Sequence, residues 1–433
     1  MMKWKWVSYI GVLFFILVGL QLTGCGLSES ANNIVVPSIF AQQDIKKEKV
    51  NVDVYWDATY SMQGYTTIAS GNAYRNLPDR LEDVGNSMGD TKFFRFGETV
   101  QPLEGREHRK FSEASFYNET VTAIHTVIDS TDSDHLSIVV TDLFESNSDW
   151  SNVAKKIKEK YFAQHLAVAI VGIKNPFNGD IFDVGLDNMK FNYNSGADSN
   201  KYRPFYMMIL GHENDVKEFL QRWKDKNAAS NETQYLLLSE NLMDQVPTLA
   251  TMEIVDSKNV FADEKLNIAD KRMKEFGIDA YGDQAMIMTR FTYKPVIDGC
   301  KVDMGKLKTS IQAQVLSDGV WQPTEIDGDL NFQIKEDNER PDDYLLTMSF
   351  TPEKTLRKDS INLIHAVVEP SYNGFTLPDW VRNWNMENPA GVTPDQFDGS
   401  KTINFMHLVQ SLKESALDAA KPSLANITLV VSK

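Results

Sequence analysis

Residues 50–64 read VNVDVYWDATYSMQG, and this stretch decides the predicted fold. It opens with a short apolar run, Val50–Trp56, that we interpret as a strand. The polar residues Asp57, Thr59 and Ser61 follow at once, each two positions from the next. A strand that leads into evenly spaced carboxylate and hydroxyl groups indicates a binding loop at the end of a sheet strand.

Short apolar runs alternate with helical periods from residue 49 to residue 239. Leu77, Leu81, Val84 and Met88, for example, share one face of a predicted helix. This alternation indicates βαβ units, so we predict an α/β domain with a doubly wound, mostly parallel, Rossmann-like sheet. The predicted strands are Val50–Trp56, Lys92–Phe96, Leu136–Val140, Leu166–Val171, Phe205–Leu210 and Tyr235–Leu238.

A second predicted strand also ends in an aspartate. Leu136–Val140 leads directly into Thr141 and Asp142. Ligands of doubly wound sheets bind beyond the carboxyl ends of the strands. We therefore expect Asp57 and Asp142 to meet at one end of the sheet, although 85 residues separate them.

These residues resemble the von Willebrand factor A domain. In that family the first strand ends in Asp-x-Ser-x-Ser, often with Met and Gly close behind, and a later strand ends in Thr-Asp. Here Asp57, Thr59 and Ser61 are accompanied by Met62 and Gly64. The resemblance covers residues 49–239. It implies a metal-ion-dependent adhesion site for Mg²⁺, or for Mn²⁺ or Ca²⁺.

The chemistry of the same side chains agrees with such a site. Mg²⁺ prefers oxygen ligands in near-octahedral geometry, which the hydroxyls of Thr59 and Ser61 and the carboxylates of Asp57 and Asp142 offer. An open metal position can then take an acidic side chain from a protein ligand. We expect the loop that carries Asp57 to be exposed, so replacing this residue should leave the fold intact.

The resemblance also implies a threonine from the loop between the two strands. Thr120 is the best match, and Thr122 and Ser115 are alternatives. The chain departs from the family pattern at Thr59, where Ser is usual, and at Leu143, where Gly commonly follows Thr-Asp. An A-domain fold whose site binds no metal therefore remains the alternative interpretation.

The sequence offers little for catalysis. An aspartyl-nucleophile phosphatase needs a second Asp two residues after Asp57, where Thr59 stands. The seven histidines show no short metal-ligand spacing, and no Gly-rich phosphate loop or nucleophile elbow is present. We therefore predict that the protein is not an enzyme.

The N-terminus predicts a lipid anchor. The apolar run Val7–Leu22 follows two lysines and is shorter than the roughly 20 residues of a membrane-spanning helix. It ends in the letters LTGC and resembles a bacterial lipoprotein signal. This implies that residues 1–24 are removed and that lipidated Cys25 anchors the protein to the extracytoplasmic face of the cell membrane. Residues 25–48 show no regular period, and we interpret them as a tether.

The pattern changes in the second half of the chain. Residues 240–284 are predicted to form a partly helical connection, and residues 285–370 a β-sandwich-like domain of short strands. Residues 371–433 hold a Trp/Pro-rich segment, a helix and a final strand. We predict that Trp380 and Trp384 pack against a neighbouring domain. The sequence leaves open which domain the helix and the strand join.

The charged-residue composition indicates which classes of partner the protein can bind. The 433 residues include 44 basic and 60 acidic side chains, a formal charge of −16, which argues against nucleic-acid binding because phosphates need clustered Lys and Arg. The combined prediction is a lipid-anchored protein that uses a metal-dependent adhesion site to bind a protein or polymer ligand. The alternative is a metal-independent structural module of a cell-envelope assembly.

Overall fold

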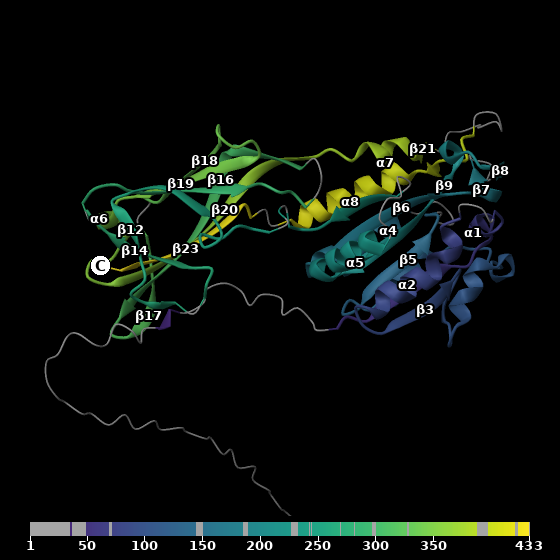
Figure 1. Cartoon of the computed structure of the whole chain (residues 1–433), viewed down its shortest axis with the longest axis horizontal. Helices are drawn as coiled ribbons and strands as arrows, with labels where there is room; N and C mark the ends of the chain where they lie inside the picture. The colour runs from purple at the N-terminus through teal and green to yellow at the C-terminus, as the bar shows by residue number, and fades with distance from the viewer. Residues whose placement is uncertain are drawn as a thin grey trace, which may run out of the picture.

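The chain forms an α/β region and a β-rich region that lie end to end along the long axis of the molecule (Figure 1). The C-terminus lies in the β-rich region, at the far end from the α/β region. The computed structural model describes residues 35–36, 49–68, 72–143, 150–184, 189–226, 233–241, 243, 245–268, 270–280, 282–296, 300–326, 329–387, 397–420 and 423–432.

The α/β region is organised around a seven-stranded sheet with the order β10-β6-β9-β5-β2-β3-β4. Central strand β2 pairs in parallel with β3 and with β5, whereas the other four pairings are antiparallel. The strands are β2 (Val52–Asp57), β3 (Thr91–Phe96), β4 (Val100–Pro102), β5 (Leu136–Thr141), β6 (Ala167–Asn175), β9 (Arg203–Gly211) and β10 (Thr233–Leu238).

The sheet is therefore mixed, and the prediction of a mostly parallel sheet was wrong. Between β6 and β9 the described residues form the hairpin of β7 (Asn178–Val184) and β8 (Met189–Asn194) and a short 3₁₀ turn, η8 (Ser199–Lys201). A parallel return needs a crossover, usually a helix, so β9 runs back antiparallel between β5 and β6. Because β9 is buried along its whole length, its sequence looks like that of a parallel strand.

Helices cover both faces of this sheet, as the doubly wound prediction requires. On one face, α2 (Leu77–Asn86) and α5 (Glu213–Lys226) pack against a cluster that includes Val54 and Trp56. On the other face, α3 (Ile124–Ser130) and α4 (Trp150–Lys160) share a second cluster with Tyr55 and Val139. Successive β2 side chains thus alternate between two apolar cores, which holds the end of β2 firmly in place.

Short helices carry the chain between these elements. One of them, α1 (Tyr60–Gln63), begins directly behind the loop that follows β2 and continues into η2 (Gly64–Thr66). The remaining 3₁₀ turns of this region are η3 (Tyr74–Asn76), η4 (Glu107–Ser112), η5 (Ala114–Phe116) and η7 (Phe162–Gln164).

The C-terminal segment returns to the α/β region before it ends in the β-rich one. α7 (Asp379–Asn383) and α8 (Phe405–Ala419) lie over the sheet beside α4 (Figure 1), and the short strands β21 (Asn385–Met386) and β22 (Thr402–Ile403) pair between them. Trp380 and Trp384 are buried in the second core cluster, which confirms that they serve packing. The helix that the sequence left unassigned therefore completes the α/β region.

Two sheets enclose a separate core in the β-rich region. The orders are β11-β15-β19-β18 and β12-β14-β23-β20-β16-β17, and residues of both sheets share one apolar cluster. The short helix α6 (Pro352–Thr355) precedes β20. The strands are β11 (Glu253–Lys258), β12 (Val260–Asp263), β14 (Lys274–Ile278), β15 (Ala285–Thr292), β16 (Cys300–Ser317), β17 (Val320–Thr324), β18 (Asn331–Glu336), β19 (Asp343–Phe350), β20 (Ile361–Phe375) and β23 (Ala425–Ser432).

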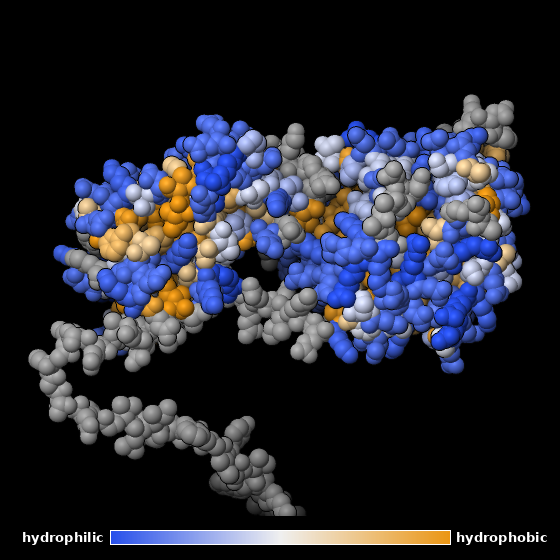
Figure 2. All heavy atoms as spheres, viewed as in Figure 1, coloured by the Kyte–Doolittle hydropathy of each residue, from blue (hydrophilic) through white to orange (hydrophobic). Residues whose placement is uncertain are grey.

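This arrangement corrects the predicted connection over residues 240–284. The segment supplies β11, β12 and β14 to the two sheets instead of a partly helical linker. β14 pairs antiparallel with the nearby β12 and in parallel with β23, which lies more than 150 residues later in the chain. Figure 2 shows apolar side chains gathered on the visible face of this region, and the exposed large apolar residues here are Val255, Phe261, Ile311 and Val320.

The predicted signal, residues 1–24, the lipidated Cys25 and most of the tether lie outside the described residues. Within the tether, Val35–Val36 forms the short strand β1, which pairs in parallel with β13 (Asn267–Ile268). Of the helices that the structure describes, none combines the length and the apolar character that a membrane span requires.

Candidate functional site

The candidate site lies where two neighbouring parallel strands end. Asp57 is the last residue of β2, and Thr141, the last of β5, is followed by Asp142. β3 and β5, the two parallel neighbours of β2, lie on opposite sides of it. Where the strand order reverses in this way, a crevice forms at the carboxyl ends of the strands. The Thr141 hydroxyl donates to Asp57 Oδ2 at 2.8 Å, so the two strand ends are in direct contact.

Asp57 is a buried carboxylate whose oxygens accept hydrogen bonds from Thr59 and Thr141. Its Oδ1 accepts from the Thr59 backbone N–H at 3.0 Å and from the Thr59 hydroxyl at 2.7 Å. Burial and, to a smaller extent, the nearby charge of Asp142 together raise the pKa of Asp57 to about 7, against the lowering effect of these hydrogen bonds. The ionised form would thus be stabilised by any cation placed beside it.

The expectation of an exposed loop was wrong. Asp57 is fully buried, and Thr59, Ser61 and Asp142 are also buried. The reason is the segment after η5, which lies along the loop: the Glu119 N–H donates to Ala58 O at 3.1 Å, and the Tyr60 N–H donates to Glu119 O at 3.1 Å.

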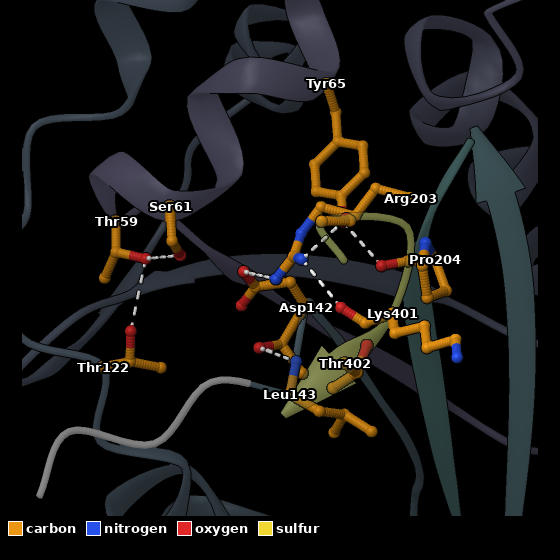
Figure 3. Close-up of polar contacts among 12 residues, drawn as sticks. Thr59, Ser61, Tyr65, Thr122, Asp142, Leu143, Arg203, Pro204, Lys401 and Thr402 are labelled. Atoms are coloured by element: carbon orange, nitrogen blue, oxygen red, sulfur yellow. Dashed lines mark hydrogen bonds and ion pairs between the residues drawn. The ribbon is translucent and has the colours of Figure 1, made fainter. Parts of the chain in front are cut away.

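The hydroxyls of Thr59, Ser61 and Thr122 lie together (Figure 3), and that of Thr59 donates to Asp57. The Thr59 and Ser61 hydroxyl oxygens lie 3.1 Å apart, and the Thr122 hydroxyl donates to the Thr59 hydroxyl at 3.2 Å. Thr122, one of the alternatives from the sequence, therefore holds the contact that we expected of Thr120. Thr120 is exposed and lines the pocket in front of these hydroxyls. Backbone pairing of Glu119 with the β2 loop brings both threonines to this position.

Asp142 lies beside a positively charged side chain of the same protein, that of Arg203. Arg203, the first residue of β9, places Nη2 3.7 Å from Asp142 Oδ2, and both side chains are buried (Figure 3). Arg203 Nη1 donates to the backbone carbonyls of Gly399 and Lys401 at 3.1 and 2.9 Å. The C-terminal segment thus fixes the guanidinium that neutralises Asp142.

Sequence reasoning missed Arg203. The available signal was an Arg-Pro pair at the start of the wholly apolar run FYMMIL, because an arginine on a buried strand needs an acidic partner. That partner could not be named, since Arg203 and Asp142 are 61 residues apart and meet only through the antiparallel pairing of β5 with β9.

Leu143, which follows Asp142, adopts a backbone conformation that favours glycine. Its φ is +56°, in the left-handed region that non-glycine residues rarely adopt, and its N–H donates to the Thr141 hydroxyl at 3.2 Å. Its side chain is buried in the second core cluster. Packing of this side chain therefore offsets a backbone strain of about 1 kcal/mol or more.

A pocket opens in front of the hydroxyls. Its volume is about 240 Å³, and its lining combines polar oxygens with the rings of Tyr60 and Phe182. Tyr60 is 43% exposed at its mouth. The lining residues are Thr59, Tyr60, Ser61, Glu119, Thr120, Thr122 and Phe182.

Comparisons with known proteins add no assignment: no protein-family model matches the chain, and no curated protein matches its sequence. Any functional conclusion therefore depends on the arrangement of these side chains.

Proposed function

We propose that the protein is a lipid-anchored extracytoplasmic protein whose α/β region, similar to a von Willebrand factor A domain, binds a divalent cation and, through it, an acidic ligand. The ion would be held by the hydroxyls of Thr59, Ser61 and Thr122 and by the carboxylates of Asp57 and Asp142, directly or through water. Thr120 stands beside this set at the pocket wall.

One observation carries this proposal: the spacing of the hydroxyl oxygens around a buried carboxylate. Mg²⁺ binds oxygen at about 2.1 Å, so neighbouring ligands of an octahedron lie about 3.0 Å apart. The Thr59–Ser61 and Thr59–Thr122 oxygen distances are 3.1 and 3.2 Å. The donor set contains only oxygen, which suits Mg²⁺ or Mn²⁺ better than a soft metal.

The bound ion would supply an electrophilic position at the floor of the pocket. Glu119 lines the pocket and already pairs with Arg95 at 2.9 Å, so a bound cation would supply the free positive charge that attracts a carboxylate. The rings of Tyr60 and Phe182 offer apolar contact around it. A protein or polymer that presents an acidic group beside an apolar one fits this pocket.

Calorimetry with the chelator-treated full chain tests the metal site. We expect binding of one Mg²⁺ or Mn²⁺ ion at millimolar concentration or below. Partners that co-purify with the solubilised protein should be lost with chelator and return with Mg²⁺. A chain that binds neither ion at millimolar concentration contradicts the proposal.

Arg203 supports a second candidate function, a metal-independent structural module. Its guanidinium already neutralises Asp142, so a protein contact could form at this end of the sheet without an added ion. Complexes that form equally well with and without chelator would favour this candidate. The adhesion-site proposal requires the opposite result.

Cys25→Ser tests the proposed anchor. The sequence around Cys25 predicts cleavage before this residue and attachment of lipid to its thiol. We therefore expect the variant to accumulate as an unprocessed precursor or to leave the membrane fraction, measured by lipid labelling and fractionation. Cys300→Ser, which replaces the other cysteine, is the control and should be labelled normally. Unchanged labelling of Cys25→Ser would contradict the proposed anchor.

A further inference from the structure

A second cluster of metal-ligating side chains lies on α2 and η4, outside the site described above. Asp79 and Glu82 are three residues apart on α2 and share one face of that helix. His108 approaches them from η4. The ligand atoms of the three side chains all lie within 4.8 Å of one another. Among the described residues, this group of His, Asp and Glu side chains is close enough together to hold a metal ion.

His108 is the decisive member of this cluster. Its side chain is only 2% exposed and stacks on Phe93, with ring centroids 4.2 Å apart. Within the described part of the chain its buried Nε2 has no hydrogen-bond partner. Buried polar atoms are normally satisfied, so an imidazole nitrogen directed at two carboxylates without a hydrogen bond indicates a missing ligand.

The distances suit a tetrahedral ion. Ligands at about 2.1 Å from a tetrahedral Zn²⁺ lie about 3.4 Å apart. His108 Nε2 and Glu82 Oε2 are 3.4 Å apart. Asp79 is exposed and its carboxylate already lies within 4.8 Å of the other two ligand atoms, although Arg109 Nε lies 3.6 Å from its Oδ1 and competes for it.

We propose that Asp79, Glu82 and His108 bind a Zn²⁺-type divalent ion, with water in the fourth position. Two carboxylates balance the charge of the ion, and the neutral imidazole supplies the nitrogen ligand that Zn²⁺ accepts and Mg²⁺ does not favour. The ion would join α2 to η4 on the same face of the sheet as the first apolar core. This proposal is independent of the adhesion site, whose ligands are all oxygen atoms.

Zinc titration of the chelator-treated full chain, with Mg²⁺ in excess, tests the proposal. We expect one Zn²⁺ ion whose affinity falls about a hundredfold or more in Glu82→Gln and in Asp79→Asn, because loss of outer-shell partners alone already costs about 10–100-fold. Both substitutions keep the size of the side chain, and neither disturbs the stacked ring of His108. Asp83→Asn, on the same helix but paired with Lys226, is the matched control and should bind like the wild type.

Cobalt provides a second measurement that reports geometry. Co²⁺ added to the wild type should give the visible absorption of a tetrahedral site, and Glu82→Gln should lose it. Zinc affinity that is equal in the wild type and in both variants would overturn the proposal, as would a wild-type chain without zinc binding. Asp57→Asn should leave this zinc site intact, so the two proposals can fail separately.

Discussion

Asp57→Asn is expected to lower the affinity for Mg²⁺ and Mn²⁺ by about a hundredfold or more relative to the wild type. The site loses one of its two carboxylates. The fold should survive, because an amide oxygen still accepts from Thr59 and the amide N–H₂ can donate to the Thr141 hydroxyl. Calorimetry with each ion measures the loss.

The same substitution should change how stability depends on pH. Burial and Asp142 raise the pKa of Asp57 to about 7 in the folded protein, against a normal value of 3.8. The folded state therefore holds this proton more tightly than the unfolded chain. The contribution of Asp57 to stability is greatest below pH 3.8 and is lost as the pH rises through about 7.

Metal-free wild type should consequently unfold more easily at pH 8 than at pH 5, relative to Asp57→Asn. The ionised carboxylate costs on the order of 4 kcal/mol at most, at about 1.36 kcal/mol for each pH unit between the two pKa values. Mg²⁺ should remove this difference, because it stabilises the charged form. Thermal unfolding of both proteins at the two pH values, with and without Mg²⁺, measures the effect.

Asp53→Asn is the matched control for this experiment. Asp53 lies on the same strand and is also buried, but it pairs with His135 at 2.8 Å and not with the hydroxyl cluster. It should bind Mg²⁺ like the wild type. If Asp57→Asn retains metal affinity, or if Mg²⁺ does not stabilise the wild type at pH 8, Asp57 is not a metal ligand.

A fragment that comprises residues 49–241 is expected not to fold on its own, although it contains every strand of the seven-stranded sheet. It lacks the C-terminal segment that covers one face of that sheet. Nine side chains of this segment belong to the second core cluster: Leu377, Trp380, Val381, Trp384, Phe405, Leu408, Val409, Leu412 and Ala416. Burial of large apolar side chains contributes about 1.5–3 kcal/mol each, so together they match the whole stability of a typical domain.

Circular dichroism and thermal unfolding should therefore show no cooperative transition in the fragment. Co-expression of residues 376–420 should restore it. A fragment that unfolds cooperatively at the same temperature as the full chain would contradict this prediction. It would mean that α7 and α8 only rest on the sheet.

Point substitutions on α8 measure the same contact in the full chain. Leu412 is fully buried, and Leu412→Ala should lower the free energy of unfolding by about 2–5 kcal/mol. Glu414, two residues further on, is exposed, and Glu414→Ala should stay within about 0.5 kcal/mol of the wild type.

Much of the site could be predicted because it depends on local patterns. The apolar run that leads into Asp57, Thr59 and Ser61 can be recognised within the 15 residues 50–64. The run that ends in Thr141 and Asp142 can be recognised in the same way. Strands that end in this way carry their polar residues to the same edge when they are parallel neighbours, as β2 and β5 are.

Features that depend on distant partners could not be predicted. Choosing Thr122 over Thr120 requires the backbone pairing of Glu119 with the β2 loop, because both threonines follow the same helix-start pattern. Similarly, the antiparallel direction of β9 follows from the hairpin before it and not from its own residues.

The sequence by itself determined the α/β character of residues 49–239, the two strand ends and the residue types at the site, because hydrophobic period and residue chemistry are local properties of the chain. Tertiary structure alone decided three things: that Asp57 is buried, that Arg203 neutralises Asp142, and that α8 completes the α/β region. Each of these depends on pairing between segments far apart in the chain, and burial and electrostatic partners are set by such contacts.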